Sequence, residues 1–166
     1  MELLFSTGIR VSELCHVRDT ELNLKDCYVR IYGKGAKERI LQIGNPDVLH
    51  ILHVYRSLFH EEITNSGFFF INRLGHPLSE QSVRLLLLHY EKTLNLPQHI
   101  TPHMFRHTFA TQLLEEDVDI RYIQHILGHS SITTTQIYTH ISSNKQKEIL
   151  CQKNPRNALG KQLKNS

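Results

Sequence analysis

The chain has 166 residues, 40% of them hydrophobic, which predicts one globular domain and excludes a disordered chain. No apolar run approaches the roughly 20 residues that span a bilayer, so no membrane helix is expected. The formal net charge of +3 is uneven, because residues 142–166 carry six Lys or Arg and one acid; binding to an acidic polymer must therefore come from locally placed basic side chains and this basic stretch.

The predicted elements are mostly helices. Alternating apolar residues predict strands at 27–32 and 38–43, and the glycine-rich residues between them predict a hairpin turn. Apolar residues at helical spacing, with helix-end signals, predict helices at 1–6, 10–17, 45–59, 79–94, 101–116, 119–128 and 143–151, and another that begins at Ser130 or Ser131 and carries Tyr138. The fold class is therefore mainly α with a small antiparallel β-sheet, that is, α+β.

Residues that favour helix ends set these boundaries. Polar N-cap residues, two of them followed by proline at the first helical position, stand at Asn45, Ser79, Thr101 and Asp119. Gly8 and Gly128 each follow a predicted helix, at the position where glycine favours the left-handed conformation that ends it.

One predicted helix presents His103 and Arg106 on the same face, because the two residues are three positions apart. Phe105, Phe109 and Leu113 mark its buried stripe, and Arg106 lies at the edge of that stripe. A partly desolvated guanidinium needs an anionic partner. That partner is either a bound phosphate or, as the simpler alternative, a glutamate in a structural salt bridge.

Two further basic residues stand where an anion would bind. Arg10 follows Thr-Gly at a helix start, where backbone N–H groups favour negative charge. Lys34 lies between two glycines at the predicted hairpin tip, and Lys37 lies in the same turn. Each taken alone also fits an ordinary surface arginine or an exposed turn, and Gly-Lys-Gly lacks the spacing of a Walker loop.

His129 and Tyr138 complete the candidate set. His129 follows the glycine that ends a helix, on a loop where its ring can face a ligand, and Tyr138 stands nine positions later as a candidate nucleophile. The chain has twelve histidines and six tyrosines, so a surface or packing role is the alternative for either residue taken alone.

A metallohydrolase is a rival hypothesis. His103 and His107, like His125 and His129, are spaced at i, i+4, as in zinc-binding helices. Neither pair includes the glutamate of His-Glu-x-x-His, and the sequence indicates no third ligand. The metal hypothesis is therefore the weaker one, and no metal or other cofactor is expected.

The order of four strings resembles the tyrosine recombinases, and within them the Xer and phage-integrase branch. The strings are Thr-Gly-Ile-Arg-Val-Ser-Glu-Leu, Gly-Lys-Gly-Ala-Lys-Glu-Arg, His-Met-Phe-Arg-His-Thr-Phe-Ala-Thr and Leu-Gly-His-Ser-Ser-Ile-Thr-Thr-Thr-Gln-Ile-Tyr-Thr-His. The resemblance implies that family's catalytic-domain fold over residues 1–150, followed by a basic tail at 151–166. The family often has glycine where Asp117 stands, and aspartate tolerates the left-handed conformation better than most residues.

The resemblance also implies an activity and its residues. It implies a site-specific recombinase or integrase that cuts and rejoins DNA through a 3′-phosphotyrosyl intermediate, without a cofactor. It assigns catalytic roles to Arg10, Lys34, His103, Arg106, His129 and Tyr138, the last as the nucleophile. It assigns DNA contacts to Arg10, Lys34, Lys37 and Arg106.

Partners and alternatives follow from the same resemblance. It implies double-stranded DNA as partner, a tetramer on DNA for the full-length protein, and a C-terminal segment exchanged between protomers. Family members carry a core-binding domain before the first string, so we expect this chain to lack that domain. The alternatives are a non-catalytic DNA-binding fragment of a truncated integrase and a relaxing enzyme like the type IB topoisomerases. Three cysteines without metal-site spacing favour free thiols, and hence the cytoplasm.

Overall fold

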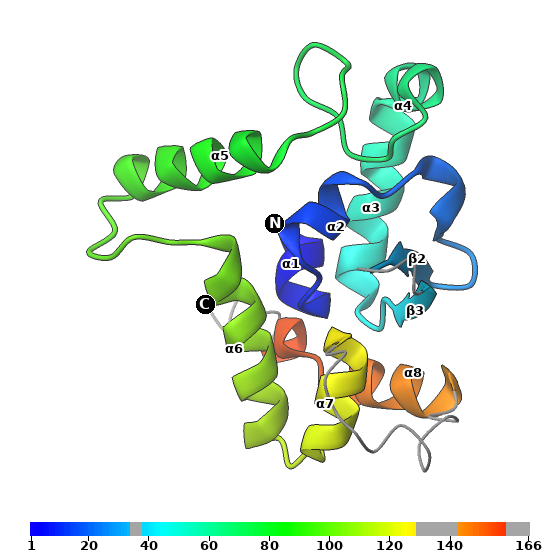
Figure 1. Cartoon of the computed structure of the whole chain (residues 1–166), viewed down its shortest axis with the longest axis vertical. Helices are drawn as coiled ribbons and strands as arrows, with labels where there is room; N and C mark the ends of the chain where they lie inside the picture. Colours follow the sequence, from blue (N-terminus) through cyan, green and yellow to red (C-terminus); the bar gives the residue numbers. More distant parts are fainter. Residues whose placement is uncertain (34–37, 129–142, 159–166) are drawn as a thin grey trace.

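The computed structural model of the chain describes residues 1–33, 38–128 and 143–158. It is mainly helical with one small sheet, as the sequence predicts (Figure 1). The helices are α1 (Glu2–Thr7), α2 (Val11–Cys15), α3 (Pro46–Leu58), α4 (His60–Ser66), α5 (Glu80–Thr93), α6 (Pro102–Glu115), α7 (Ile120–Leu127) and α8 (Ser143–Gln152). The strands are β1 (Leu22–Asn23), β2 (Tyr28–Tyr32) and β3 (Glu38–Gln42), and a 3-10 turn covers Asp19–Glu21.

The three strands form an antiparallel sheet in the order β1-β2-β3. The register of β2 and β3 places Val29 opposite Leu41, and both side chains are fully buried. α8 packs against β3 and contributes the buried Leu150 to the same core. The pairing of β2 with β3 confirms the predicted strands, whereas β1 was not predicted, because two residues are too few to show an alternating pattern.

The helical core forms around α6, which packs against α1 and α7 (Figure 1). Phe109 and Leu113 of α6, Leu4 of α1 and Ile126 of α7 are all buried in one cluster. Burying an apolar side chain of this size contributes about 1.5–3 kcal/mol. This packing confirms the predicted stripe on α6 and fixes the helix that carries His103 and Arg106.

The predicted helix starts at Asn45, Ser79, Thr101 and Asp119 are confirmed, whereas the helix predicted to begin at Ser130 or Ser131 lies outside the described residues. Asn45, Ser79 and Asp119 each accept, through a side-chain oxygen, a hydrogen bond from a backbone N–H in the first turn of the following helix. Thr101 is the N-cap residue of α6 without such a bond, and its helix begins with proline as expected.

The predicted helix stops are confirmed as well. Gly8 ends α1 at φ 62°, Gly128 ends α7 at φ 67°, and Asp117 adopts φ 57° after α6. A Cβ atom on Gly8 would lie 2.6 Å from Cδ1 of Phe109, which is too close for any side chain. Gly8 therefore combines a left-handed turn with a close contact to the core, and both require glycine.

α5 extends away from the rest of the fold (Figure 1). The helical spacing of Val83, Leu86, Leu87, Tyr90 and Leu94 predicts one buried face, but only Val83 and Leu87 are buried, and the other three are exposed. The apolar pattern predicts the helix correctly, but it does not predict which of its apolar side chains are buried. α4 was not predicted, because a seven-residue helix with only Ile63 buried has no apolar period to detect.

The described residues that follow α8, up to residue 158, pack against the body of the domain. α8 ends at Gln152, and the expected boundary between a catalytic domain at 1–150 and a basic tail at 151–166 stays a prediction. Asn154 is buried and donates a hydrogen bond to the Ser6 carbonyl (2.9 Å), and Asn157 accepts one from Asn45 (2.7 Å). The residues up to 158 are therefore held by specific contacts to α1 and to the start of α3.

Two further expectations concern thiols and membranes. The three cysteines are free, as predicted, with Cys15 buried and Cys151 exposed. Among the described helices, none has both the length and the apolar composition needed to cross a bilayer.

Candidate functional site

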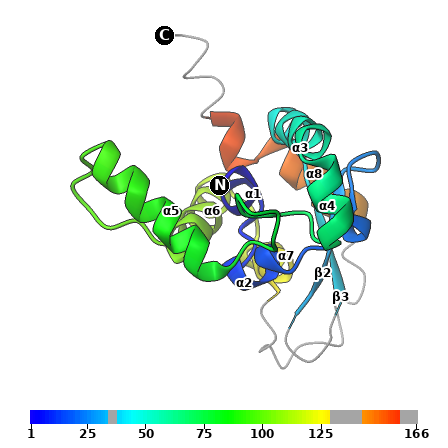
Figure 2. The same cartoon turned by 90° about the horizontal axis from the view of Figure 1, so that it is seen from above.

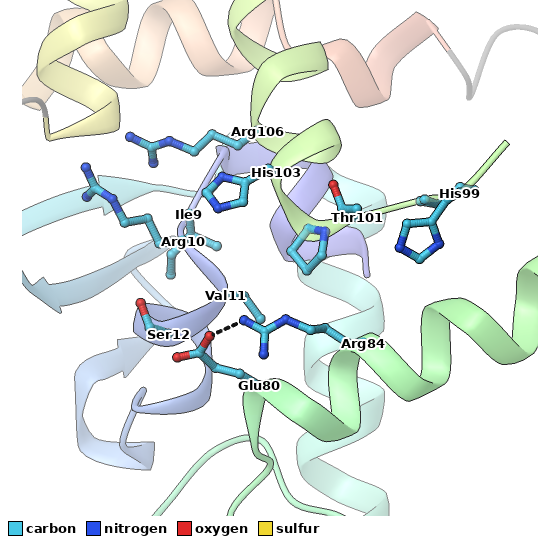
Figure 3. Close-up of a pocket in the computed structure, with 12 residues that line it drawn as sticks. Ile9, Arg10, Val11, Ser12, Glu80, Arg84, His99, Thr101, His103 and Arg106 are labelled. Atoms are coloured by element: carbon cyan, nitrogen blue, oxygen red, sulfur yellow. Dashed lines mark hydrogen bonds and ion pairs between the residues drawn. The ribbon is translucent and has the colours of Figure 1, made fainter.

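A pocket of about 330 Å³ lies between α2, the first turns of α5 and the start of α6 (Figure 3). Arg10, His103 and Arg106 line one end of it, so the structure brings together three of the residues predicted from sequence. Arg84 and His99 line the other part. Figure 2 shows α2 between α5 and the strands β2 and β3.

The local fold positions Arg10. The left-handed Gly8 turns the chain out of α1, and Ile9 anchors the turn because its side chain is fully buried. Arg10 is then the N-cap residue of α2, with an extended backbone. Its side chain is 39% exposed, and it points toward the same end of the pocket as Arg106 (Figure 3).

Glu13 holds Arg10 in place. One carboxylate oxygen accepts a hydrogen bond from the Arg10 backbone N–H and the other from Nη1 of its guanidinium, both at 3.0 Å. Nη2 of Arg10 also donates to the Gly128 carbonyl at 3.4 Å. The expectation of free backbone N–H groups near Arg10 is thus modified, because Glu13 already occupies one of them.

Arg39, like its partner Glu13, is a site residue that was not predicted from the sequence. It lies at the start of β3 and donates from Nη1 and Nη2 to the two oxygens of Glu13, each at 2.8 Å. Its partner is 26 positions away, so no local pattern links the two residues. The available signal was weaker: Glu13 and Arg39 lie in the Thr-Gly-Ile-Arg-Val-Ser-Glu-Leu and Gly-Lys-Gly-Ala-Lys-Glu-Arg strings.

Arg106 is half-buried and donates to two main-chain carbonyls, Gly8 O from Nη1 and Leu127 O from Nη2, both at 2.7 Å. Within the described part of the chain no glutamate forms a salt bridge with it, so the structure contradicts the simpler alternative of a glutamate partner. These contacts use two of the five guanidinium N–H groups, which leaves donors that can bind an anion.

Burial and neighbouring charges shift the pKa values of the site. Burial lowers the pKa of Arg106 to about 10, and the charges of Arg10 and Arg39 act in the same direction. Burial alone would raise the pKa of Glu13, but hydrogen bonds from Arg39 and Arg10 outweigh it and hold that pKa below its ordinary value. Glu13 pairs with Arg10 and Arg39, and Arg106 lies near enough to feel the charges of all three. The surplus of positive charge suits a phosphate.

The remaining predicted residues are placed as follows. His103 is exposed at the pocket wall, on the first turn of α6. Lys34, Lys37, His129 and Tyr138 lie outside the described residues, so their positions relative to the arginines stay predictions. Among the residues that are described, no three His, Cys, Asp or Glu side chains are grouped in a way that could hold a metal ion.

The sequence matches the Phage integrase family over residues 1–145. It is 60% identical over 156 residues to a curated tyrosine recombinase of Agathobacter rectalis, covering 94% of this chain and 51% of the relative. It is 39% identical over 160 residues to tyrosine recombinase XerD of Staphylococcus haemolyticus, covering 94% of this chain and 54% of the relative. The chain thus spans about half the length of the curated relatives it matches.

Solved structures of recombinases are similar to this fold. The crystal structure of XerA recombinase superposes with a TM-score of 0.72 at 32% identity, covering 93% of this chain and 56% of that one. The XerH site-specific recombinase bound to its difH substrate, in a pre-cleavage complex, superposes with a TM-score of 0.60 at 26% identity, covering 89% of this chain and 43% of that one.

Proposed function

The chain belongs to the phage integrase family, and from that premise we propose that it is the catalytic domain of a site-specific DNA recombinase. The observation that supports this most strongly is the convergence of Arg10, His103 and Arg106 on one pocket with a surplus of positive charge. The proposed substrate is a phosphodiester of double-stranded DNA. A phosphate would lie between the two guanidinium groups, each with donors to spare.

The proposed reaction begins with attack of the Tyr138 hydroxyl oxygen on phosphorus. Charge then grows on the two non-bridging oxygens, and the guanidinium groups of Arg10 and Arg106 stabilise it. A phenol has an ordinary pKa near 10, so only about one in a thousand is ionised at neutral pH. His103 would accept the phenolic proton, and nearby positive charge favours the phenolate.

The leaving group is the 5′-oxygen of the cut strand. Lys34 would donate a proton to it as the bond to phosphorus breaks, and His129 would donate to a phosphate oxygen. The products are a 3′-phosphotyrosyl bond and a free 5′-hydroxyl. The covalent bond conserves the energy of the phosphodiester, so attack by another 5′-hydroxyl can rejoin strands without ATP.

The assembly is part of the same proposal. We propose that the protein acts as a tetramer on DNA and that a C-terminal segment passes between neighbouring protomers. Lys37 would contribute to DNA binding beside Lys34. Because the arginines supply the charge that metals supply in other nucleases, the reaction would need no metal ion.

A covalent trapping assay tests the proposal. The chain is incubated with a duplex carrying a nick near the scissile phosphate and is then denatured, so that only a covalent adduct survives. Tyr138→Phe removes the attacking oxygen and is expected to abolish the adduct, while non-covalent DNA binding stays nearly unchanged. Tyr90→Phe is the matched control, since Tyr90 is exposed on α5 and does not line the pocket. A denaturant-resistant adduct formed by Tyr138→Phe would show that Tyr138 is not the nucleophile.

A further inference from the structure

Arg39 and Glu13 form a bidentate ion pair in the site. The two Nη atoms of Arg39 face the two oxygens of Glu13 in parallel, each at 2.8 Å, and the side chains are only 14% and 6% exposed. A bidentate pair of this kind fixes both the distance and the orientation of the carboxylate. Because the pair is largely shielded from water, solvent and salt screen its attraction less than they screen that of a surface pair.

The same carboxylate holds Arg10. Its oxygens that accept from Arg39 also accept from the Arg10 backbone and guanidinium, so Glu13 lies between two arginines. Arg39 comes from the sheet and Arg10 from the start of α2, and Glu13 is the only described carboxylate that pairs with either. The orientation of Arg10 is therefore coupled to the position of β3.

Gly128 adds a second contact to this arrangement. A Cβ atom at Gly128 would lie 3.0 Å from Cζ of Arg39, and φ is 67° there. The Arg39 guanidinium thus passes closely over the end of α7, and only glycine combines this space with this backbone conformation. The carbonyl of Gly128 is also the one to which Arg10 donates. Arg39 is therefore packed between α2 and α7.

We propose that Arg39 is a positioning residue, which fixes the Glu13 carboxylate and, through it, the guanidinium of Arg10 that binds the phosphate. Arg39 is assigned no direct contact with the phosphate, because it does not line the pocket as Arg10 and Arg106 do and both of its Nη atoms donate to Glu13. This inference rests on the proposed function for the role of Arg10. The coupling from Arg39 through Glu13 to Arg10 is a property of the fold and can be measured without activity.

The activity test compares Arg39→Lys and Arg39→Gln with Arg30→Gln. Arg30 lies on β2 of the same hairpin, in an exposed pair with Glu38, and serves as the matched control. Single-turnover cleavage and DNA affinity are measured separately. Misplacing a substrate-binding group by about 1 Å can cost on the order of a hundredfold in rate. We expect both Arg39 variants to lose at least about tenfold in cleavage rate with affinity changed far less, and the control to match wild type.

The lysine variant separates positioning from direct binding. Lysine keeps the charge but cannot form the two parallel bonds to Glu13. If Arg39 bound the phosphate as a charge, Arg39→Lys would retain cleavage and Arg39→Gln would lose affinity, and either result overturns the proposal. A double variant with Glu13→Gln is expected to be no slower than the worse single variant, because both act on Arg10. If the rate losses of the two single variants multiply in the double variant, that result also overturns the proposal.

The second measurement needs no DNA. The Glu13 carboxyl is titrated by carbon-13 NMR in wild type, Arg39→Lys, Arg39→Gln and Arg30→Gln. We expect its pKa to rise in the Arg39 variants and to stay unchanged in the control. If wild type forms no covalent DNA adduct, the proposed function fails, yet this titration still tests the link. An unchanged Glu13 pKa in a folded Arg39 variant would disprove the coupling.

Discussion

Glu13 accepts hydrogen bonds from both the main chain and the side chain of Arg10, so one carboxylate fixes the start of α2 and the direction of its N-cap arginine. The Glu13 carboxylate is almost fully buried. It pairs with Arg10 and Arg39, and its charge also acts on Arg106. It therefore contributes to folding as well as to the site, and the two contributions respond differently to pH.

Stability should fall on acidification in a way that depends on Glu13. Its pKa in the folded chain is below the ordinary value of 4.5, so its contribution is fully present above that value. The contribution is lost as pH falls through the lowered pKa, because the folded state must then take up a proton. Urea unfolding between pH 7 and pH 3 measures the effect. Glu13→Gln should be less stable at pH 7, and its free energy of unfolding should fall less steeply between pH 7 and pH 3. Glu148 is in an exposed ion pair, so Glu148→Gln should follow wild type.

Arg106→Ala should impair cleavage and folding together. Loss of one charged donor to the transition state costs about a hundredfold or more in rate. The Gly8 and Leu127 carbonyls also lose their donor, which predicts a fall of about 1–3 kcal/mol in the free energy of unfolding. Arg106→Lys keeps the charge but cannot bridge both carbonyls, so it should remain impaired in both measurements.

Arg56→Ala is the control for the Arg106 variants. Arg56 also donates to two main-chain carbonyls, those of Asp19 and Leu22, but outside the pocket. Its loss should lower stability without slowing cleavage, when cleavage is measured well below the unfolding midpoint. If Arg106→Ala cleaves as fast as Arg56→Ala, Arg106 has only a structural role.

Cleavage should persist in EDTA. The charge on the phosphate would be met by guanidinium, imidazole and ammonium groups, so chelation removes nothing that the reaction needs. Covalent adduct formation is measured before and after dialysis against EDTA, with metal analysis of the same samples. Stoichiometric zinc in the purified chain, with activity lost on chelation and restored by zinc, would instead support the metallohydrolase.

Asn45→Ala should destabilise the domain by about 1–2 kcal/mol, since Asn45 caps α3 and is buried. Its amide also donates to Asn157, so part of the loss reflects docking of the C-terminal residues. A double-mutant cycle with Asn157→Ala should show a coupling of about 0.5 kcal/mol or more. The exposed cap Ser79 provides the control, because Ser79→Ala should be strictly additive with Asn157→Ala. Additivity at Asn45 would mean that residues 154–158 are not held there in solution.

Local signals in the sequence were enough for much of the fold. Gly8, Asn45, Asp119 and Gly128 each act within one helical turn, where the preferences of glycine and short polar side chains decide the backbone conformation. The pairing of β2 with β3 followed from alternation and a glycine-rich connection. α4 and β1 could not be predicted, because a short element with one or two buried residues has no measurable period.

The site was only partly predictable for a different reason. Arg10, His103 and Arg106 could be selected from the motifs, but their partners depend on long-range packing. Arg106 binds the ends of two helices that are far away in sequence, and Arg39 reaches Glu13 across 26 positions. Likewise, the exposure of Leu86 on α5 depends on how that helix projects from the fold.

Gly8 belongs to the core and to the site at once. Its α-carbon packs against the Phe109 ring, and its carbonyl oxygen receives a hydrogen bond from Arg106. Any substitution that repacks the core beneath this turn will also shift an oxygen that orients a site arginine. Few substitutions at these positions will therefore be neutral. Variants selected for thermal stability near Phe109 will tend to lose catalytic rate.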